Sequence, residues 1–414
     1  MKLDQFEGYN YIDGGVTASL GYTANGLNCG LDPDKNKNDL GLVYAEKTCN
    51  AAAVYTTNKV KGAPIIVTKR HLDANGGKAR AIIVNSKNAN TMNANGIEIA
   101  DEMCKLVADG MNIPEDEVIV ASTGVIGEVM SIEPFENSID ELIKGLSVEG
   151  HSKAVNAIMT TDTVPKEVAV EFTLGGKTCH LGGMAKGSGM INPNMATTLN
   201  FITSDVAISS DMIAKALSEV VKVTYNCLTI DGDTSTNDMV SVIANGLSGN
   251  EEITLENADY DIFKQALYVV MSQMTRMLAR DGEGATKLIE CEVDGAPSLD
   301  TAIKIAKSVV GSNLFKCAIF GEDANWGRIA CAIGYTDADF SIEGIDCDFA
   351  SDAGVVHVCK DGFGVPFSEE EAAKVLKEDE IRVIINLNQG EERAKAWGCD
   401  LTYDYVKING DYRS

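Results

Sequence analysis

The stretch MAKGSGMINPNMATTLN, residues 184–200, combines a glycine-rich segment with a turn and two adjacent threonines. Its glycines follow a single lysine, and Asn192-Pro193-Asn194 comes shortly before Ala196-Thr197-Thr198. Glycine and Asn-Pro sequences permit tight turns that other residues resist. The layout suits a strained peptide bond held beside a hydroxyl group, and we hypothesise that the chain cuts itself between Ala196 and Thr197. By itself an internal Ala-Thr pair is ordinarily structural, so the hypothesis needs support from the rest of the sequence.

Cleavage before Thr197 would turn a weak nucleophile into a useful one. A threonine hydroxyl reacts only when a base removes its proton, and an N-terminal threonine carries that base in its own α-amine, whose reference pKa is about 7.7–8.0. In the self-consistent route, the Thr197 hydroxyl attacks the Ala196 carbonyl, an N-to-O shift gives an ester, and water releases Ala196. The product would be an N-terminal nucleophile for acyl transfer.

Two glycine-containing segments bear on an acyl-transfer site. KGSG at 186–189 lacks the G-x-x-x-x-G-K-[ST] order of a nucleotide-binding loop, but its missing Cβ atoms would let substrate approach the backbone closely. Ser122-Thr123-Gly124 follows the apolar run 117–121 and could present a hydroxyl and a backbone amide to a developing oxyanion. The alternative for the second segment is an ordinary turn at the end of a strand.

Composition bounds the class of protein and its partners. With 414 residues the chain is long enough for one large domain plus a smaller one, or two of similar size, and its glycine-rich, aromatic-poor composition is typical of an α/β protein. The formal charge of −26 repels nucleic acid and anionic lipid surfaces. The N-terminus lacks a signal-peptide pattern and no run of about 18 apolar residues occurs, so we expect a cytoplasmic protein that binds neither nucleic acid nor membrane.

No metal site is expected. The eleven cysteines form no C-x-x-C pair and have no histidine at ligand spacing, which argues against zinc. Cys227, Cys317 and Cys331 lie in apolar runs, where we expect reduced thiols in the core. The run DGDTSTND at 231–238 lacks the glycine and final glutamate of a calcium loop, so turn and hydrogen-bonding roles are favoured over calcium.

Apolar periodicity predicts a mixture of strands and helices. Apolar runs predict buried strands within 80–90, 117–124, 226–233 and 314–323, and helical spacing predicts helices around 97–107 and 261–280. Residues 168–183 resemble a hairpin that turns at Gly175-Gly176, which favours a layered α/β fold with mixed or antiparallel sheets. DGEGAT at 281–286 interrupts the pattern, so we place a domain boundary there: 1–285, and a smaller α/β domain at 286–414.

Nine segments, in the same order, closely resemble the ornithine acetyltransferase family, the glutamate N-acetyltransferases of arginine biosynthesis known as ArgJ. They are GVTASLGYTANG at 15–26, NSKNAN at 85–90, ASTGVIG at 121–127, IMTTDTVPK at 158–166, MAKGSGMINPNMATTL at 184–199, DGDTSTNDMV at 231–240, GEGATK at 282–287, GEDANWGRI at 321–329 and NGDYRS at 409–414. The resemblance runs along the whole chain, and nine ordered matches are highly specific.

The resemblance implies a fold and a set of functional residues. The fold would be the layered αββα sandwich that the family shares with N-terminal-nucleophile aminopeptidases of the DmpA type, cut into an α chain of 1–196 and a β chain of 197–414. The oxyanion pair would be Thr123 and Gly124, and Thr197 would be the nucleophile. The implied substrate contacts are Thr160, Lys186, Thr197, Glu283, Asn409 and Ser414.

The resemblance also implies the reaction and the partners. Thr197 would take acetyl from N2-acetylornithine and pass it to glutamate in a ping-pong cycle, without a cofactor, and acetyl-CoA is a possible second donor. The two chains would stay associated, in the family usually as a heterotetramer of two α and two β chains. Two alternatives remain: an N-terminal-nucleophile amidase or aminopeptidase of the same fold, and a non-catalytic amino-acid-binding protein.

Three residues depart from what the family resemblance leads us to expect. Lys87 stands where glycine is usual, Thr198 follows the nucleophile where a bulkier apolar residue is common, and the final residue is Ser414 rather than threonine. We expect Lys87 to point outward with its charge in solvent. Thr198 places a second hydroxyl beside the first, so cleavage one residue later is an alternative.

The two adjacent threonines allow a matched test of the cleavage site. We predict that Thr197→Ala yields one uncut chain, because no hydroxyl remains to attack the Ala196 carbonyl, whereas Thr198→Ala is still processed. Intact-protein mass spectrometry of freshly purified protein distinguishes the two. Two fragments from the Thr197 variant, or an uncut Thr198 variant, would move the nucleophile away from Thr197.

Overall fold

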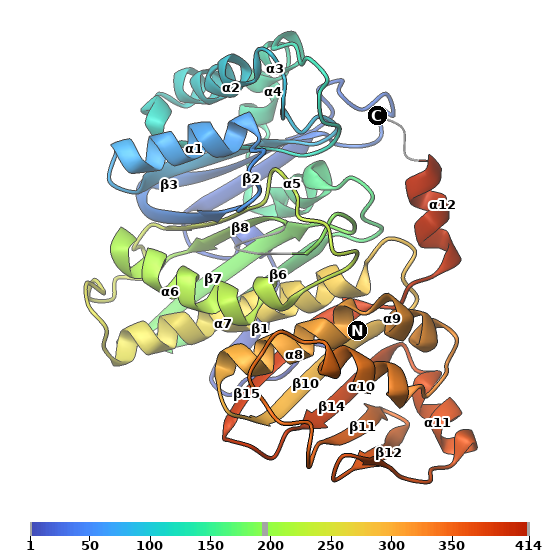
Figure 1. The fold of residues 1–414 in the computed structure, drawn as a ribbon. Coiled ribbons are helices and arrows are strands. Elements are labelled where there is room, and N and C mark those ends of the chain that lie inside the picture. The colour runs from blue at the N-terminus through green and yellow to red at the C-terminus, as the bar shows by residue number, and fades with distance from the viewer. Residues whose placement is uncertain (1, 193–197, 412–414) are drawn as a thin grey trace.

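The main body of the protein is a sandwich of four layers, helices outside and strands inside. The structure is a computed structural model that describes residues 2–192 and 198–411. In Figure 1, helices α1 (Ala63–Ala74) and α2 (Gly96–Met111) cover one face of the strands, and α6 (Ser210–Val223) and α7 (Ala258–Arg280) cover the other. A second, smaller sheet with its own helices lies below α7 in this view.

The two strand layers belong to one hydrogen-bonded sheet that folds over on itself. Among the described residues it has nine strands, in the order β1-β6-β7-β8-β9-β3-β4-β5, with β2 also pairing with β3. Their bounds are β1 Tyr9–Ile12, β2 Tyr22–Leu27, β3 Leu40–Tyr55, β4 Lys78–Asn85, β5 Val118–Ser122, β6 Lys166–Leu174, β7 Lys177–Lys186, β8 Leu199–Ser204 and β9 Met239–Ala244. The long strand β3 pairs with β2 and β4 in its first half and with β9 in its second, so it joins the layers.

Three apolar clusters fill the spaces between the layers. One lies between strands β3–β5 and helices α1 and α2, and includes Ile83 and Met103. The second lies between the two strand layers and includes Val84 and Phe201. The third packs β6–β9 against α6 and α7. Because side chains alternate across a strand, Ile83 and Val84 of the same strand face different clusters. The predicted αββα architecture is confirmed by this arrangement.

Side-chain caps explain where helices α6 and α7 begin. The Ser209 side chain accepts a hydrogen bond from Met212 N at the start of α6, and Asn257 does the same for Tyr260 N at the start of α7. The remaining helices of these layers are α3 Glu133–Glu136, α4 Ile139–Lys144 and α5 His151–Ile158. The helices predicted around 97–107 and 261–280 are confirmed as α2 and α7. No helix of the described residues is both long and apolar enough to cross a bilayer.

The hairpin of β6 and β7 turns where the sequence predicts. Leu174 pairs with Lys177, and Gly175 and Gly176 form the turn with φ of 56° and 72°. Positive φ at both central residues gives the tight turn that matches strand twist, and glycine adopts it without steric cost. The hairpin carries Lys186 to the far end of β7, beside the start of β8 at Leu199.

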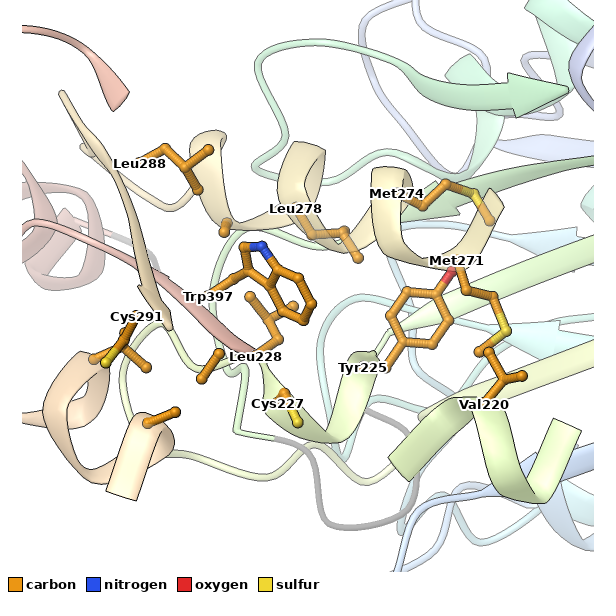
Figure 2. Packing of buried hydrophobic residues seen from close by; sticks show 14 of the residues in the cluster. Val220, Tyr225, Cys227, Leu228, Met271, Met274, Leu278, Leu288, Cys291 and Trp397 are labelled. Carbon is orange, nitrogen blue, oxygen red and sulfur yellow. The ribbon is translucent and has the colours of Figure 1, made fainter. Parts of the chain in front are cut away.

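The C-terminal part has a six-stranded sheet in the order β13-β12-β11-β14-β10-β15, counted over the described residues. Its strands are β10 Leu288–Ala296, β11 Asp346–Ser351, β12 Gly354–Lys360, β13 Phe363–Gly364, β14 Glu380–Asn386 and β15 Glu392–Cys399, and its helices are α8 Leu299–Gly311, α9 Asn313–Phe320, α10 Trp326–Gly334 and α11 Glu369–Leu376. Trp397 of β15 packs near Leu278 of α7 and Leu228, so one apolar cluster continues into both parts (Figure 2). The boundary between residues 285 and 286 stays a prediction.

Two of the predicted strands are wrong. Residues 314–320 belong to helix α9, because the Ser312 side chain caps Phe315 N and Phe315, Ala318 and Ile319 are buried at helical spacing. Residues 226–233 contain a 3₁₀ turn, Tyr225–Cys227, followed by single bridges rather than a strand, with Thr229 N bonded to Trp397 O and Ile230 N to Ile191 O. A short apolar run in the sequence fits a buried helix or an irregular buried segment as well as it fits a buried strand.

The cysteine prediction holds only in part. All eleven thiols are free and Cys227 is buried, as expected for a core residue. Cys317 and Cys331 are exposed instead, because they occupy solvent-facing positions of α9 and α10 while their neighbours Phe315 and Ile329 face the core.

The cluster between the strand layers should contribute strongly to the stability of the sandwich. Phe201 is fully buried there, so we predict that Phe201→Ala lowers the free energy of unfolding by about 3–5 kcal/mol through lost burial and a residual cavity. Phe363→Ala is the matched control, because that ring is 77 % exposed and should change the free energy by less than about 0.5 kcal/mol. Urea unfolding measures both; equal effects would contradict this packing.

Candidate active site

A small cavity forms where seven separate segments of the chain converge. Its volume is about 160 Å³. The lining comes from the segment after β4, the turn after β5, the loop after α5, the end of β7 with its glycine-rich loop, the segment before β9, the segment after α7, and helix α12 (Tyr403–Asp411). The residues that line it are Ala89, Thr123, Gly124, Ile126, Thr160, Thr161, Lys186, Gly189, Met190, Ser235, Thr236, Asn237, Glu283 and Asn409.

The residues that the family resemblance implies are brought together in this cavity. The structure describes six of these residues, and all six line the cavity although they are spread over almost 290 positions of the sequence. They are Thr123, Gly124, Thr160, Lys186, Glu283 and Asn409. Ala196, Thr197 and Ser414 lie outside the described residues. The catalytic and binding roles of all nine stay predictions.

The turn after β5 requires glycine at position 124. Gly124 has φ of 132°, and a Cβ there would lie 2.1 Å from the carbonyl carbon of Lys87. Thr123 N donates to Asn85 O and Val125 N donates to Lys87 O, whereas no hydrogen bond among the described residues uses the Gly124 N–H. The turn therefore presents an unused backbone donor beside the cavity, as an oxyanion site needs.

Asn237 fixes this turn and was missed by the sequence analysis. Its Nδ2 donates to Ser122 O at 2.9 Å and to Ala89 O at 2.6 Å, and its Oδ1 accepts from Thr91 and Thr236. The side chain is only 5 % exposed, so these bonds form away from water, where unmade bonds would be costly. The sequence indicated a polar turn at 231–238 but contained no signal for this partner across the sandwich.

The glycine-rich loop lets neighbouring groups approach the cavity closely. A Cβ on Gly189 would lie 2.4 Å from the Glu283 carboxyl group, and one on Gly187, at φ 150°, would lie 2.7 Å from Thr198 Cγ2. Thr198 itself is buried, and its hydroxyl accepts a hydrogen bond from Asn200 Nδ2. This hydrogen bond occupies a lone pair of the Thr198 hydroxyl that an attacking oxygen would use.

The polar run at 231–238 holds the segment that precedes the predicted cleavage point. Asp231 accepts hydrogen bonds from Met190 N and Ile191 N at 2.6 and 2.9 Å, and Thr234 Oγ1 donates to Asn192 O at 2.8 Å. The predicted hydrogen-bonding role of this run is confirmed. Among the described residues, the one histidine-carboxylate group that could hold a metal is His71, Asp101 and Glu115, none of which lines the cavity.

Lys87 behaves differently from the outward, solvated lysine that was expected. Its φ is 76°, a left-handed conformation that favours glycine, and this explains why glycine would be usual at the position. Its Nζ forms an ion pair with the buried Asp32 carboxylate at 2.6 Å. Burial raises the pKa of Asp32, but Lys87 and the Asp34 amide outweigh it, so the pKa falls below its ordinary value.

Lys186 is the cation of the cavity. Its Nζ donates to Thr123 Oγ1 at 3.2 Å. Burial lowers the pKa of Lys186 below its ordinary value, although the carboxylates of Asp162, Asp238 and Glu283 oppose this effect. Burial alone would raise the pKa of Asp162, but Lys186 and Lys166 hold it at about 2. Burial raises the pKa of Asp238 well above its ordinary value, although hydrogen bonds from Ser235 and the charge of Lys186 oppose this effect.

Glu283 and Asn409 close the cavity on the C-terminal side. Asn409 Nδ2 donates to Glu283 Oε2 at 2.7 Å, and Glu283 N donates to Ser188 O at 2.8 Å. Helix α12, which carries Asn409, extends from the six-stranded sheet past the strand layers (Figure 1). The site thus offers a cation, a carboxylate and hydrogen-bond donors in a small volume, a combination suited to a small molecule with both a carboxylate and an amino group.

Comparisons with known proteins converge on one family. Residues 23–414 match the ArgJ family. The arginine biosynthesis bifunctional protein ArgJ 1 of Clostridium acetobutylicum is 49 % identical over 92 % of this chain and 93 % of its own, and the glutamate N-acetyltransferase of Methanocaldococcus jannaschii is 45 % identical over 97 % and 99 %. The crystal structure of the bifunctional protein argJ from Bacillus halodurans is 48 % identical, covers 51 % of this chain and 98 % of that one, and gives a TM-score of 0.48.

The unused donor at Gly124 can be tested with two glycine variants. Gly124→Ala should reduce turnover by about 10²–10³-fold, because the added Cβ collides with the Lys87 backbone and displaces the N–H from the cavity. Gly127→Ala is the matched control: its φ of 83° imposes similar backbone strain, but no atom lies within 4 Å of the added Cβ. Steady-state rates and melting temperatures separate the effects. Similar losses of rate in both variants would assign the effect to strain alone.

Proposed function

The chain belongs to the ArgJ family, and we propose that it transfers the acetyl group of N2-acetyl-L-ornithine to L-glutamate through an acetyl ester on Thr197. The observation that carries the proposal is the convergence of Thr123, Gly124, Thr160, Lys186, Glu283 and Asn409 on one cavity. These six residues come from five separate segments of the chain, and the packing of the fold alone does not require their side chains to meet around one polar cavity.

Self-processing is the first step of the proposed mechanism. The Thr197 hydroxyl attacks the Ala196 carbonyl, the Ala196–Thr197 amide becomes an ester as the amine leaves, and water then hydrolyses that ester. The α chain ends with the Ala196 carboxylate, and the β chain begins with Thr197 and its free amine. The fixed segment at 190–192, held by Asp231 and Thr234, and the start of β8 at Leu199 flank this bond and support a constrained geometry.

Acetyl transfer then follows in two halves. The Thr197 amine takes the hydroxyl proton as Oγ attacks the acetyl carbonyl of the donor, and the proton passes to ornithine as its amine leaves. In the second half, the glutamate amine attacks the ester and Thr197 recovers its proton. The Gly124 N–H and the Thr123 hydroxyl stabilise the oxyanion in both halves. Since Lys186 donates to Thr123 Oγ1, the Thr123 proton is free to point toward that oxyanion.

Charge complementarity supports the choice of substrates. Both ornithine and glutamate carry an α-carboxylate, which Lys186 would hold in a charge-assisted bond, and Glu283 with Asn409 would meet an amino group. Thr160, which also lines the cavity, would add a hydrogen-bonding group. The carboxylate contact is the same in both halves, which explains how one site could accept two amino acids in turn.

The wider assignments rest on family membership. We propose that the two chains remain associated, as a heterotetramer of two α and two β chains, and that the enzyme acts in the cytoplasm within arginine biosynthesis. The chemistry uses the threonine and its amine and needs no cofactor, and acetyl-CoA is proposed as a second acetyl donor. The domain division at 285/286 would place all the described lining residues of the cavity except Asn409 in the first domain.

The decisive assay follows both products. With N2-acetylornithine and glutamate, we expect equal amounts of ornithine and N-acetylglutamate, and negligible acetate when glutamate is absent. Acetate release at the same rate without glutamate would identify an amidase in which water resolves the ester. Binding of ornithine by an uncut chain without any transfer would identify a binding protein.

Lys186 gives a variant with a defined kinetic signature. Lys186→Ala should raise KM for both substrates by about 10- to 100-fold, since a hydrogen bond to a charged group contributes about 1.5–3 kcal/mol, with a smaller effect on kcat. Lys105→Ala, an exposed lysine of α2, is the control and should match the parent enzyme. Unchanged saturation in the Lys186 variant would exclude it as the carboxylate contact.

A further inference from the structure

A buried cluster of charges lies directly behind the cavity. Lys166 Nζ contacts Asp162 Oδ1 at 2.7 Å and Asp281 Oδ2 at 2.5 Å, and the side chains are 0, 0 and 6 % exposed. Removing three charged groups from water is expensive, and a well-packed apolar set would often stabilise a fold at least as well. The cluster therefore calls for an explanation beyond stability.

Asp162 connects the cluster to two walls of the cavity. Its Oδ2 accepts a hydrogen bond from Thr160 N at 3.0 Å, and its Oδ1 accepts one from Gly187 N at 2.7 Å. One carboxylate thus fixes the backbone at Thr160 and the residue that follows Lys186. A lysine could not replace Asp162, because the N–H groups of Thr160 and Gly187 both need a hydrogen-bond acceptor and an ammonium group only donates.

Asp281 connects the cluster to the third wall. It follows the last residue of α7, and its carboxylate accepts from Thr163 N at 3.0 Å and from the Thr163 hydroxyl. Two residues later, Glu283 begins the cavity lining. Lys166 therefore holds together the loop with Thr160, the end of β7 with Lys186 and the segment with Glu283.

The same cluster sets the electrostatic surroundings of Lys186. Asp162 on the loop after α5, Asp238 before β9 and Glu283 after α7 all favour the charged ammonium, whereas Lys166 on β6 disfavours it. No carboxylate of the described residues forms an ion pair with Lys186, whose described hydrogen bond goes to Thr123. The ammonium is kept charged from a distance and stays available to a ligand.

We propose that Asp162 is a positioning residue for the transfer reaction: its carboxylate places Lys186 through the Gly187 N–H and balances the Lys186 charge, while Lys166, anchored by Asp281, competes for that carboxylate. The inference rests on the proposed function, because Lys186 acts there as the contact for the substrate carboxylate. Asp162 touches neither substrate nor reacting atoms; it acts through Lys186, Gly187 and Thr160.

Removing a negative charge and removing a positive charge near Lys186 should shift the pH dependence of kcat/KM in opposite directions. If protonated Lys186 binds the carboxylate, kcat/KM falls at high pH as Lys186 loses its proton. Asp162→Asn removes an attractive negative charge, lowers the pKa of Lys186 and should move this alkaline limb to lower pH by about one unit. Lys166→Met removes a repulsive positive charge, raises the pKa of Lys186 and should move the limb to higher pH.

The matched control is Asp205→Asn. Asp205 is a fully buried carboxylate bonded to His180 and Leu20 N, and it does not line the cavity. The Asp205→Asn variant should have a lower melting temperature, but the alkaline limb of its kcat/KM profile should not move.

Shifts of opposite sign in the two test variants support the proposal, and no shift or shifts of the same sign overturn it. If one variant does not fold, the sign in the other decides. A parent enzyme that transfers no acetyl would refute the proposed function, whereas a parent that transfers while its variants keep its profile would refute only this inference.

Discussion

The side-chain amide of Asn237 hydrogen-bonds across the two strand layers, and the geometry of the cavity depends on it. Asn237 stands just before β9 in the second layer, while its Nδ2 donors bind the carbonyls of Ser122 and Ala89 in the first. All its bonds form in the interior, where an amide with any partner missing would be costly. Gly62 makes room for it, since a Cβ there would lie 2.5 Å from the Asn237 amide. The turn with Thr123 and Gly124 is thereby held against the edge where β7 ends and β8 begins.

The second constraint on the cavity is electrostatic. The chain carries a formal charge of −26, so its overall field repels an anionic substrate such as glutamate. Lys186 offsets this locally, and burial makes its charge more effective than it would be in water. The same burial lowers the pKa of Lys186, and the nearby carboxylates oppose that effect. The buried Lys186 thus attracts an anionic substrate that the acidic protein as a whole repels, and the nearby carboxylates favour the charged form of Lys186.

Much of the fold was predictable from local patterns, and the rest depended on distant contacts. Helices α2 and α7 and the Gly175-Gly176 hairpin have strong periodicity or turn residues, and all three are present. The apolar runs at 226–233 and 314–323 misled, because short runs fit a strand and a buried helix equally well until caps such as Ser312 and their partners are known. The cavity residues followed from family resemblance, not from spacing. Asn237 was missed because the carbonyls of Ser122 and Ala89 that it binds lie more than 100 positions away. The Asp162–Lys166–Asp281 cluster was missed because Asp281 lies 115 positions from Lys166, although Asp162 is only four positions away.

The central claim, that Thr197 carries the acetyl group, is tested most directly by mapping the covalent intermediate. The protein is mixed with N2-acetylornithine alone, quenched in acid, digested and analysed by tandem mass spectrometry. The account predicts one acetyl group, on the peptide that begins with Thr197, sensitive to hydroxylamine as an ester is and lost when glutamate is added before the quench. Acetyl on another residue, or an acetyl-Thr197 peptide that glutamate does not discharge, would contradict it.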